Sequence, residues 1–417
     1  MADAFDNVQK SLEKKSRDSG EPAWLLDLRL DALGYYHEIG GTFRPQEPSG
    51  IPTNREETKR LLDRMGVREN EKDYMLGISQ INDKVYMNPV PEGFGKGIII
   101  KPLVDAVREN SALVRKHFNK IVNYRENAYA AFNMAFWDGG VFAFVPKGVK
   151  IPFQINVVFI IDKERFSQVP RALLICEDNT DVKFMEGCVA PIYREYSDHK
   201  SITEILVGKN SRLEIASMQN WSPNVATKGF KRAIIRENGH IKWVDGSFGG
   251  SRNHKTLSII LEGDNAKADV NTFITASKGQ ITRVVDRIEI NGKGCGANIQ
   301  SKSLAGNGGI TEYSSAIDLK GDKSSVFGSC ESLLLDNNSR SSSYPTVLDR
   351  ARDSWSTHES STFVFDRNAI DYLRSRGLGE EEARASMTIG FAKPFTLSLP
   401  VEYRRELERL ISIKAGA

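Results

Sequence analysis

Hydrophobic residues change their spacing twice along the chain. In residues 1–138 they recur every three or four positions, as in "AWLLDLRLDAL", where Trp24 and Leu28 fall near one helical face. This spacing predicts a mostly helical N-terminal segment. Helical spacing returns in residues 366–417, where Asp366 can cap a first helix and three glutamates open the next one, "GEEEARASMTIGF". Two helical segments therefore flank the middle of the chain.

Two further stretches of the N-terminal segment carry helical signals. "NREETKRLLDRMG" opens on a capping residue, Asn54, has acids in its first turn and stops at Gly66. "LVDAVRENSALVRKHFNKIV", residues 103–122, keeps the helical period and predicts another helix.

Residues 139–365 follow a different pattern of short alternating or β-branched runs. Runs such as "SITEILV", "TLSIILEG" and "ITRVVDRIEI" are separated by turn clusters such as "GKNSR", "EGDNAK" and "NGKGCGAN". So long a stretch of strand and turn leaves a pair of sandwiches, a large barrel or a β-solenoid. The turns rich in Asn, Gly and Ser and the length of the region favour a solenoid, although no strict sequence repeat is visible. We predict a mainly β protein with this core between helical segments.

Composition and charge limit the cellular compartment and the classes of binding partner that we expect for this chain. The chain has 417 residues, 57 basic and 54 acidic side chains and a net charge of +3, without the basic stripe of a nucleic-acid binder. Its longest apolar runs, such as "INVVFII", are far shorter than a membrane span, and its polar N-terminus lacks the apolar core of a signal peptide. The four cysteines have no CxxC spacing. We expect a cytoplasmic protein that binds neither nucleic acid nor membrane.

Missing motifs exclude several enzyme classes. The chain has no GxxxxGK[ST] phosphate loop and no GxSxG nucleophile elbow, so we expect no nucleotide hydrolysis and no serine-type catalysis of its own. A β-helix enzyme acting on carbohydrates remains an alternative, and it needs carboxylates that converge on one outer face. The acidic residues of the β region do not form a close pair in the sequence; the candidates are Asp245, Asp264, Asp269 and Asp286.

Longer strings in the middle of the chain are more specific. "MEGCVAPIY", "QNWSPNV", "KWVDGSFGG", "IQSKSLAGNGG", "CESLLLDNNSRSSSYP" and "THESSTF" occur in this order. Their succession resembles the SufB/SufD family of iron–sulfur cluster assembly proteins, and the "EGC" and "QNWS" strings make it more similar to SufB. The N-terminal "PAWLLDLRLDAL" and "FWDGGVFAFVPKGVKIPF" resemble that family too, so the likeness covers nearly the whole chain.

The resemblance implies both an architecture and a role. It implies a right-handed parallel β-helix core, residues 139–365, with helices on either side. We expect the ATPase docking site in residues 366–417, because the segment from Ile370 to Ile411 combines an apolar face with the charged run "RRELER". The protein would be a non-enzymatic scaffold subunit that works with a SufC-type ATPase and pairs with a SufD homologue or a second copy of itself. A cysteine desulfurase system would supply sulfur, and carrier proteins would receive the cluster. A SufD-like structural partner subunit without its own sulfur acceptance is the second alternative.

The resemblance also implies a metal site. Cys330 matches the family cysteine of the "CESL" string, and His358 with Glu359 match its His-Glu pair. A thiolate is a strong soft ligand for iron, whereas imidazole and carboxylate exchange more readily, which suits a cluster that must be released. The implied cargo is a transient iron–sulfur cluster, of the 4Fe-4S type. We expect both Cys330 and Glu359 where strands end and turns begin. Reduced flavin is a further cofactor of the family, but no motif here marks a flavin site.

A second set of residues is implied to accept and pass on sulfur. Cys188 matches the family cysteine that receives persulfide sulfur, and the polar positions of the implied internal route are Gln219, Trp221 and Lys231. A nearby lysine is expected to lower the pKa of the Cys188 thiol.

The chain departs from the family pattern at one string. Bacterial relatives carry an Arg and an Asn where this chain has Ile160 and Asp162, so a cation of the implied sulfur route is missing. Of the remaining cysteines, Cys176 in "LLIC" is expected in the core and Cys295 in "GKGCGAN" is expected in an exposed turn.

Overall fold

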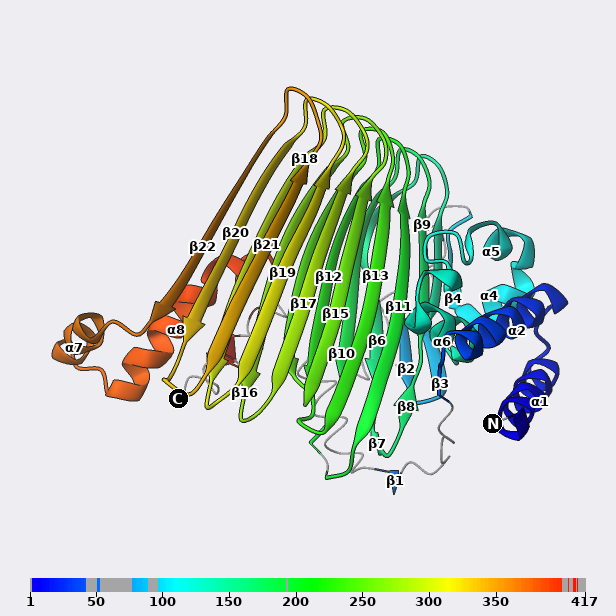
Figure 1. Ribbon diagram of the computed structural model, residues 1–417, viewed down its shortest axis with the longest axis horizontal. Coiled ribbons are helices and arrows are strands. Elements are labelled where there is room, and N and C mark those ends of the chain that lie inside the picture. Colours follow the sequence, from blue (N-terminus) through cyan, green and yellow to red (C-terminus); the bar gives the residue numbers. More distant parts are fainter. Residues whose placement is uncertain are drawn as a thin grey trace.

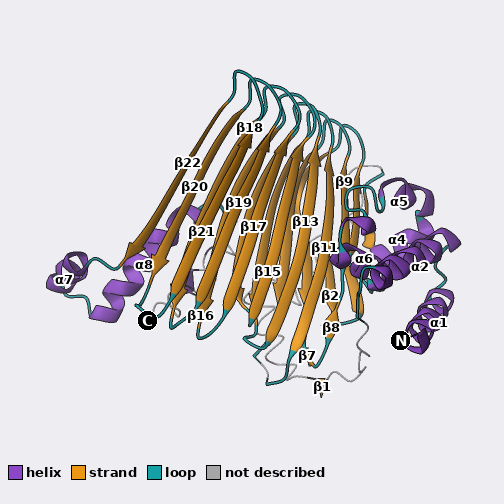
Figure 2. Cartoon of the chain, viewed as in Figure 1, coloured by secondary structure: helices purple, strands orange, loops and turns teal. Residues whose placement is uncertain are grey.

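A parallel β-solenoid forms the centre of the molecule, with helices at both ends (Figure 1, Figure 2). The computed structural model describes residues 2–42, 51–52, 77–88, 97–192, 194–399, 404, 408–409 and 411. The predicted fold class, a β-solenoid flanked by helical segments, is confirmed. The helix predicted around Asn54 lies outside the described residues.

Two ten-stranded sheets face each other along the solenoid and enclose its interior. The first sheet contains β3 (Lys84–Asn88), β2 (Gly77–Ile81), β6 (Lys150–Ile160), β10 (Asp181–Val189), β12 (Arg212–Trp221), β14 (His240–Gly249), β16 (Lys267–Ser277), β18 (Gly296–Gly306), β20 (Ser325–Leu334) and β22 (Trp355–Val364). The second contains β4 (Ile99–Pro102), β5 (Val141–Val145), β9 (Arg171–Cys176), β11 (Ser197–Val207), β13 (Val225–Ile235), β15 (Arg252–Leu261), β17 (Ile281–Ile290), β19 (Ile310–Leu319) and β21 (Arg340–Asp349), and β8 (Ser167–Gln168) pairs with β11. The short β1 (Ile51–Pro52) pairs with β7 (Lys163–Glu164) apart from both sheets. Successive strands of the chain alternate between the two main sheets, so each coil contributes one strand to each.

A repeat of the turn backbone underlies the coils, although the sequence analysis found no strict repeat. Asn179, Asn210, Asn238 and Asn265 each adopt a positive φ at the same corner of successive coils, about thirty residues apart. Their side chains form a ladder, because the amide of Asn238 donates to Asn210 Oδ1 at 3.0 Å and the others bond similarly. Asparagine tolerates the left-handed conformation better than most residues. The recurring Asn in "EDNTD", "GKNSR", "RENGH" and "EGDNA" is the signal that marks the repeat.

Alternation along each strand divides its side chains between the interior and the outer surface. The interior, called here the lumen, is filled mainly by apolar side chains in register from coil to coil. One such row of the first sheet consists of Phe184, Ile215, Trp243, Val270 and Ile299. Because strand pairing fixes the register, each inward position of one coil stacks directly on the same position of the next.

The N-terminal helices cover the start of the solenoid. They are α1 (Ala2–Asp18), α2 (Ala23–Glu38), α4 (Leu103–Glu109), α5 (Ser111–His117), the 3-10 helix η1 (Tyr124–Glu126) and α6 (Ala128–Phe136). The single helix predicted for residues 103–122 is interrupted at Asn110, which separates α4 from α5. Residues 77–102 supply β2, β3 and β4, so this part of the mostly helical segment belongs to the sheets. None of the described helices is long and apolar enough to cross a membrane.

Two C-terminal helices lie at the other end. Asp366 caps α7 (Arg367–Ser375) as predicted, since its side chain accepts from the amide of Asn368 at 3.0 Å. The following α8 (Glu380–Thr396) packs on the outer face of the first sheet, where the ring of Phe395 stacks on that of Phe273 at 5.1 Å. Figure 1 shows α7 projecting beyond the last coils.

A buried ion pair joins the N-terminal helical segment to the solenoid. Arg171 of β9 and Glu204 of β11 are both fully buried, with the guanidinium Nη2 2.6 Å from a carboxylate oxygen. The same guanidinium donates to Asn133 of α6 at 3.1 Å and to the carbonyl of Val122 at 3.2 Å. Glu204 in turn accepts from the Val122 amide at 2.8 Å. Arg171 and Glu204 are therefore the charged centre of a buried hydrogen-bond network that also holds Asn133 and the backbone of Val122.

Replacing Arg171 by methionine should lower the free energy of unfolding by about 3–5 kcal/mol, because Glu204 would be left buried without its cation. Urea denaturation followed by circular dichroism measures this loss. The matched control is Lys209→Met, which removes an exposed ion pair with Glu237 and should leave the unfolding midpoint unchanged. Similar midpoints for the two variants would contradict the assignment.

Candidate functional site

One register row inside the solenoid is polar over its whole length. In the first sheet, inward side chains of seven successive coils pair in register, and we call them the polar row: Glu186, Ser217, Asp245, Thr272, Ser301, Cys330 and Ser360. The members up to Cys330 are buried. Buried polar groups are costly unless they are hydrogen-bonded, so each member needs a partner within the lumen. Glu186, Ser217 and Thr272 find their partners in the same sheet or in the second sheet opposite.

Cys188 lies beside Glu186, the first member of the polar row, and points into the lumen from the same strand. Its strand neighbour in register is Gln219, and its thiol is 3.9 Å from Glu186 Oε1. Glu186 also accepts from the hydroxyls of Thr203 and Ser217, each at 3.3 Å, and pairs with the ammonium of Lys231 from the second sheet. The structure therefore brings three of the four predicted sulfur-route residues, Cys188, Gln219 and Lys231, to one part of the lumen.

Burial outweighs the lowering of the Cys188 thiol pKa that was expected from a nearby lysine. Burial raises the pKa of Cys188 well above its usual range, the Glu186 carboxylate raises it further, and Lys231 lowers it only in part. The ammonium of Lys231 is bonded to Glu186 and to the hydroxyl of Ser217 rather than to the thiol. Burial opposes the charge of this lysine, but the carboxylates of Glu186 and Asp245 keep its pKa above the ordinary value. Cys188 is thus a protonated thiol at neutral pH.

Trp221, the fourth predicted residue, lies at the end of the same strand as Gln219. Its ring is buried and packs against the imidazole of His199, with ring centroids 4.8 Å apart. His199 Nδ1 is 3.0 Å from Gln168 Oε1, and burial lowers the pKa of this histidine to about 3, so the imidazole is neutral. Trp221 forms part of an aromatic and amide wall beside Cys188.

The two departures from the family pattern do not line the lumen beside Cys188. Phe159 is the register neighbour of Cys188, whereas Ile160 pairs with Val189 and packs on the opposite face of the sheet. Asp162 lies beyond the end of β6 and bonds to Asn82, whose side chain accepts from the Asp162 amide at 3.0 Å. The isoleucine therefore removes no charge from the lumen itself.

Charged groups of the second sheet, for which no role was predicted, face the polar row across the lumen. Lys255 pairs with Asp245 and donates to Ser247 Oγ at 2.7 Å. Asp286 accepts from the hydroxyls of Thr272 at 2.7 Å and Tyr313 at 2.8 Å. Burial raises the pKa of Asp286 to about 6. A sequence signal could have identified such charged residues: each occupies an alternating position that points inward on its strand, where the other inward positions are apolar. Asp286 in "RVVDRIEI" is an example.

In the last coils, Cys330 of the polar row lies close to His358, which is in register with Gly328. The Cys330 sulfur is 3.2 Å from His358 Nε2, although the two residues lie on different strands, β20 and β22. Burial raises the pKa of the thiol to about 11, and burial lowers the pKa of the imidazole. The pair is therefore a neutral thiol beside a neutral imidazole, and either group can offer a soft or intermediate ligand to iron once the thiol loses its proton.

Glu359 is not brought to this pair. Its register partner is Ser329, so its side chain points to the outer face, while Cys330 and His358 point inward. Both Cys330 and Glu359 lie in the middle of their strands, not at strand ends as expected, because β20 and β22 each run well past them. Within the part of the chain that is described, no group of three or more Cys, His, Asp or Glu side chains is arranged to hold a metal ion.

The remaining cysteines take structural positions. Cys176 is buried in the main core, as expected. Cys295 is also buried, although an exposed turn was expected, because its thiol points back under the turn toward the carbonyl of Gly263 at 3.3 Å.

The carboxylates considered for a carbohydrate enzyme do not converge on an outer face. Asp245 and Asp286 point into the lumen, Asp264 accepts from the amide of Lys293 at 2.9 Å, and Asp269 pairs with His240 at 2.8 Å. They therefore lack the shared open face that a polysaccharide substrate requires.

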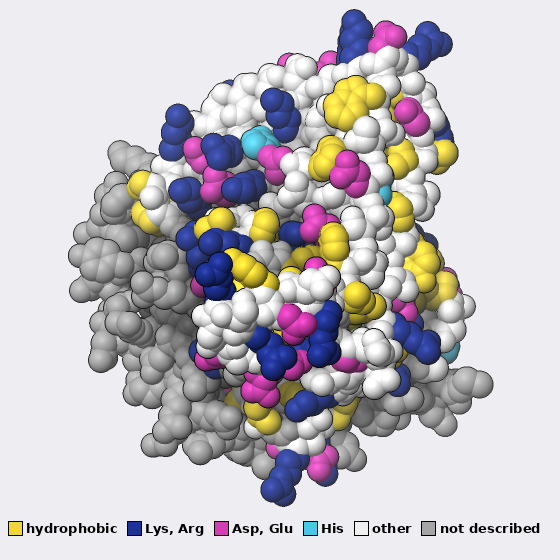
Figure 3. Space-filling model, turned by 90° about the vertical axis from the view of Figure 1, so that its left-hand side faces the viewer, with side chains coloured by type: hydrophobic (Ala, Val, Ile, Leu, Met, Phe, Trp, Pro, Cys, Tyr) yellow, Lys and Arg dark blue, Asp and Glu magenta, His cyan; other side chains and the backbone are white. Residues whose placement is uncertain are grey.

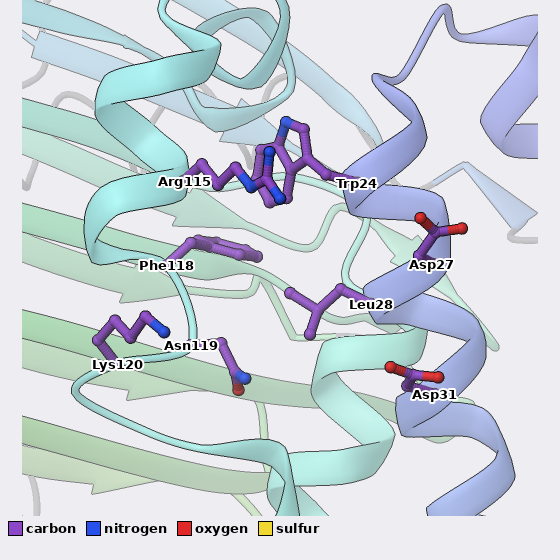
Figure 4. A pocket seen from close by; sticks show the side chains of 8 residues that line it. All are labelled: Trp24, Asp27, Leu28, Asp31, Arg115, Phe118, Asn119 and Lys120. Carbon is purple, nitrogen blue, oxygen red and sulfur yellow. The ribbon is translucent and has the colours of Figure 1, made fainter.

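A cavity of about 280 Å³ opens elsewhere, between α2 and the segment that follows α5 (Figure 4). It is lined by Trp24, Asp27, Leu28, Asp31, Arg115, Phe118, Asn119 and Lys120. It belongs to the N-terminal helical segment, at the opposite end of the solenoid from β20 and β22 (Figure 1). None of the residues predicted for sulfur or metal chemistry lines it.

Comparison with known proteins agrees with this architecture. Residues 159–391 match the family model described as SUF system FeS cluster assembly, SufBD core domain, and residues 73–157 match the SufBD protein N-terminal region. An iron–sulfur cluster assembly SufBD family protein of Staphylococcus epidermidis is 34% identical over 98% of this chain and 92% of its own length. Similar proteins of Staphylococcus haemolyticus and Staphylococcus aureus are each 33% identical over 98% and 96% of this chain. The chain therefore belongs to the SufBD family of iron–sulfur cluster assembly proteins.

Proposed function

We propose that this chain is a scaffold subunit on which a nascent iron–sulfur cluster is built and then passed to carrier proteins in the cytoplasm. The observation that carries the proposal is the polar row, which runs through the lumen from Glu186, beside the buried thiol of Cys188, to Cys330, beside His358. An interior of this kind serves ligand exchange and sulfur transfer rather than turnover of an organic substrate. Cys330 and His358 would bind iron, and the cluster would be the cargo.

The polar row supports a sulfur route through the lumen. Cys188 and Cys330 lie five coils apart, which corresponds to about 24 Å at the usual strand spacing. Between them, the two buried lysines Lys231 and Lys255 offer cations to an anionic sulfur species, and the hydroxyl groups of the row offer hydrogen bonds. A cysteine desulfurase system would supply the sulfur at Cys188, next to Gln219 and Trp221.

A second subunit would complete the metal site. Cys330 and His358 are two ligands, whereas clusters of the 4Fe-4S type are usually held by four. Among the described strands, β21 and β22 each pair on one side only, so the last coil offers two open edges to a partner. Hydrophobic side chains lie exposed on these edges among charged ones (Figure 3); they are Tyr344, Leu348, Trp355, Phe363 and Val364. The partner would be a SufD homologue or a second copy, and Glu359 on the outer face of β22 would serve the cluster from this interface.

The C-terminal helices would bind a SufC-type ATPase. This chain has no phosphate loop, so the ATPase would supply the nucleotide hydrolysis. Helix α8 is committed to the solenoid, since Ala392 and Phe395 are buried against the first sheet. Helix α7 is mostly exposed, with Ile370 buried and Tyr372 58% exposed. We therefore assign the ATPase contact to α7.

One observation favours a second candidate function, that of a SufD-like structural partner. Cys188 is fully buried and its thiol pKa is raised, so it lacks the exposed thiolate of an ordinary sulfur acceptor. In this role the chain would complete the site of another subunit and bind no cluster by itself.

Anaerobic reconstitution with iron and sulfide tests the scaffold role. The full-length chain should develop the visible charge-transfer absorption of an iron–sulfur cluster, and Cys330→Ser and His358→Ala should each lose most of it, because each removes a ligand. Glu359→Ala should reduce it less, since this carboxylate lies outside the lumen. The melting temperatures should stay within a few degrees of that of the unmodified chain.

The matched control is Cys295→Ser, which changes a buried cysteine away from the polar row and should keep the absorption. A chain that binds no iron in any form would favour the structural-partner function. Retention of the cluster in Cys330→Ser would show that the site lies elsewhere.

The Cys330 thiol should be unreactive at neutral pH. Since burial raises its pKa to about 11, the thiolate fraction and the alkylation rate should increase about tenfold per pH unit from pH 7 to pH 10. Iodoacetamide labelling of the native chain, quantified for the peptide that contains Cys330, measures this rate. In the urea-unfolded chain the same peptide should level off near the ordinary thiol pKa of about 8.5. A native rate that levels off at that same pH would contradict the effect of burial.

A charge on α7 should abolish ATPase binding. Tyr372→Glu places a carboxylate at the exposed aromatic position of α7, and co-purification with a SufC-type ATPase should be lost without a change in circular dichroism. Tyr86→Glu is the control, because Tyr86 is 54% exposed on β3 at the opposite end of the solenoid. Undiminished binding by Tyr372→Glu would move the contact away from α7.

A further inference from the structure

An apolar row of the lumen is interrupted at a glycine beside the candidate metal site. This row runs next to the polar row and consists of Phe184, Ile215, Trp243, Val270, Ile299, Gly328 and His358 in register. Five bulky side chains are thus followed by a residue with no side chain, and then by the imidazole. In stacked coils each inward position lies directly beside the same position of the next coil. The space that a side chain of residue 328 would fill is therefore open to the side chain of His358.

The imidazole fills that space. A Cβ atom on Gly328 would lie 2.3 Å from His358 Nδ1 and 3.0 Å from Cε1, which no side chain could tolerate. The backbone does not itself require glycine, since Gly328 is not among the residues with a positive φ. The ring leans over Gly328 with Nε2 toward the Cys330 sulfur, at 3.2 Å. Nδ1 is buried and has no hydrogen-bond partner among the described residues, so no second bond fixes the ring.

We infer that Gly328 is a positioning residue for His358: its missing side chain lets the imidazole lie flat across β20 and reach the sulfur of Cys330. Any β-carbon at this position would push the ring away by about 1 Å, to reach ordinary van der Waals distance. Such a shift separates Nε2 from a metal held by the thiolate. The functional meaning of this geometry rests on the proposed role of Cys330 and His358 as cluster ligands.

A double-mutant cycle on the full-length chain tests this inference, with Co²⁺ alone as an anaerobic probe. The unmodified chain should show thiolate-to-cobalt charge-transfer absorption and, in the electron paramagnetic resonance spectrum, hyperfine coupling to an imidazole nitrogen. Gly328→Ala should keep the charge-transfer band, lose the nitrogen coupling and bind Co²⁺ about tenfold more weakly. His358→Ala should behave the same way. The double variant should be no weaker than His358→Ala, because Gly328 acts only through the ring.

The strand-glycine control is Gly296→Ala on the neighbouring β18, where a Cβ would meet only Ser325 Oγ at 3.9 Å. It should bind Co²⁺ like the unmodified chain. If Gly328→Ala fails to fold, the double variant should fold, because removing the imidazole removes the clash. Retention of the nitrogen coupling in Gly328→Ala, a further loss in the double variant, or a double variant that is also unfolded would each overturn the inference.

The same titration separates this inference from the proposed function. Cys330→Ser should abolish the charge-transfer band. If that band persists in Cys330→Ser, the proposed site is wrong whatever Gly328 does. If Cys330→Ser loses the band while Gly328→Ala leaves both signals intact, the site stands and only the positioning role of Gly328 fails.

Discussion

The register between stacked coils is the constraint on which the rest of the structure depends. Each inward side chain is enclosed by the same position of the coils before and after it and by the sheet opposite, and water has little access. A polar residue placed there must find its partner within one coil or across the lumen. Because of the register, polar residues far apart in the sequence, such as Glu186, Asp245 and Cys330, line up in one row. The same condition allows His358 to reach Cys330 only because Gly328 leaves room.

The charges inside the lumen are not explained by stability. Replacing a buried ion pair by apolar residues of similar volume is often neutral or stabilising, because desolvation offsets the attraction between the charges. The lumen nevertheless holds two such pairs, Lys231 with Glu186 and Lys255 with Asp245, within rows that could be apolar. The Arg171–Glu204 pair differs, since it lies outside the lumen and joins separate elements of the fold. Charges retained in the lumen fit a site that handles anions.

Much of the fold could be predicted from the sequence, because strand alternation and helix caps are local. The solenoid between helical segments, the start of α7 at Asp366 and the core position of Cys176 all follow from short-range patterns. The break at Asn110 and the strands between residues 77 and 102 depend on packing against the solenoid, which no local pattern records. The burial of Cys295 also depends on the neighbouring coil, since its thiol points toward Gly263 there.

Whether a site residue points into the lumen or to the outer face depends on the length of each coil, and the sequence predictions did not include that length. Cys330 is in register with Ser360, so His358, two residues earlier, shares its face, while Glu359 lies on the other. Adjacent residues of one strand always point to opposite sides. A His-Glu pair can therefore never place both side chains in the lumen. Once the Asn turns give the repeat, this parity can be read from residue numbers alone.

The position of the Cys330–His358 pair at the end of the stack has a consequence for how tightly cargo is held. Solenoids are quasi-one-dimensional, and each coil is stabilised only by its nearest neighbours, so the terminal coil opens at the lowest free energy. Cys330 and His358 are joined by a single ladder, β20 with β22, and among the described strands none lies beyond β22. Fraying of this one ladder separates sulfur from nitrogen while the remaining coils stay intact. A partner that caps the edge would thus act as a latch, setting the lifetime of the bound cargo without altering either ligand.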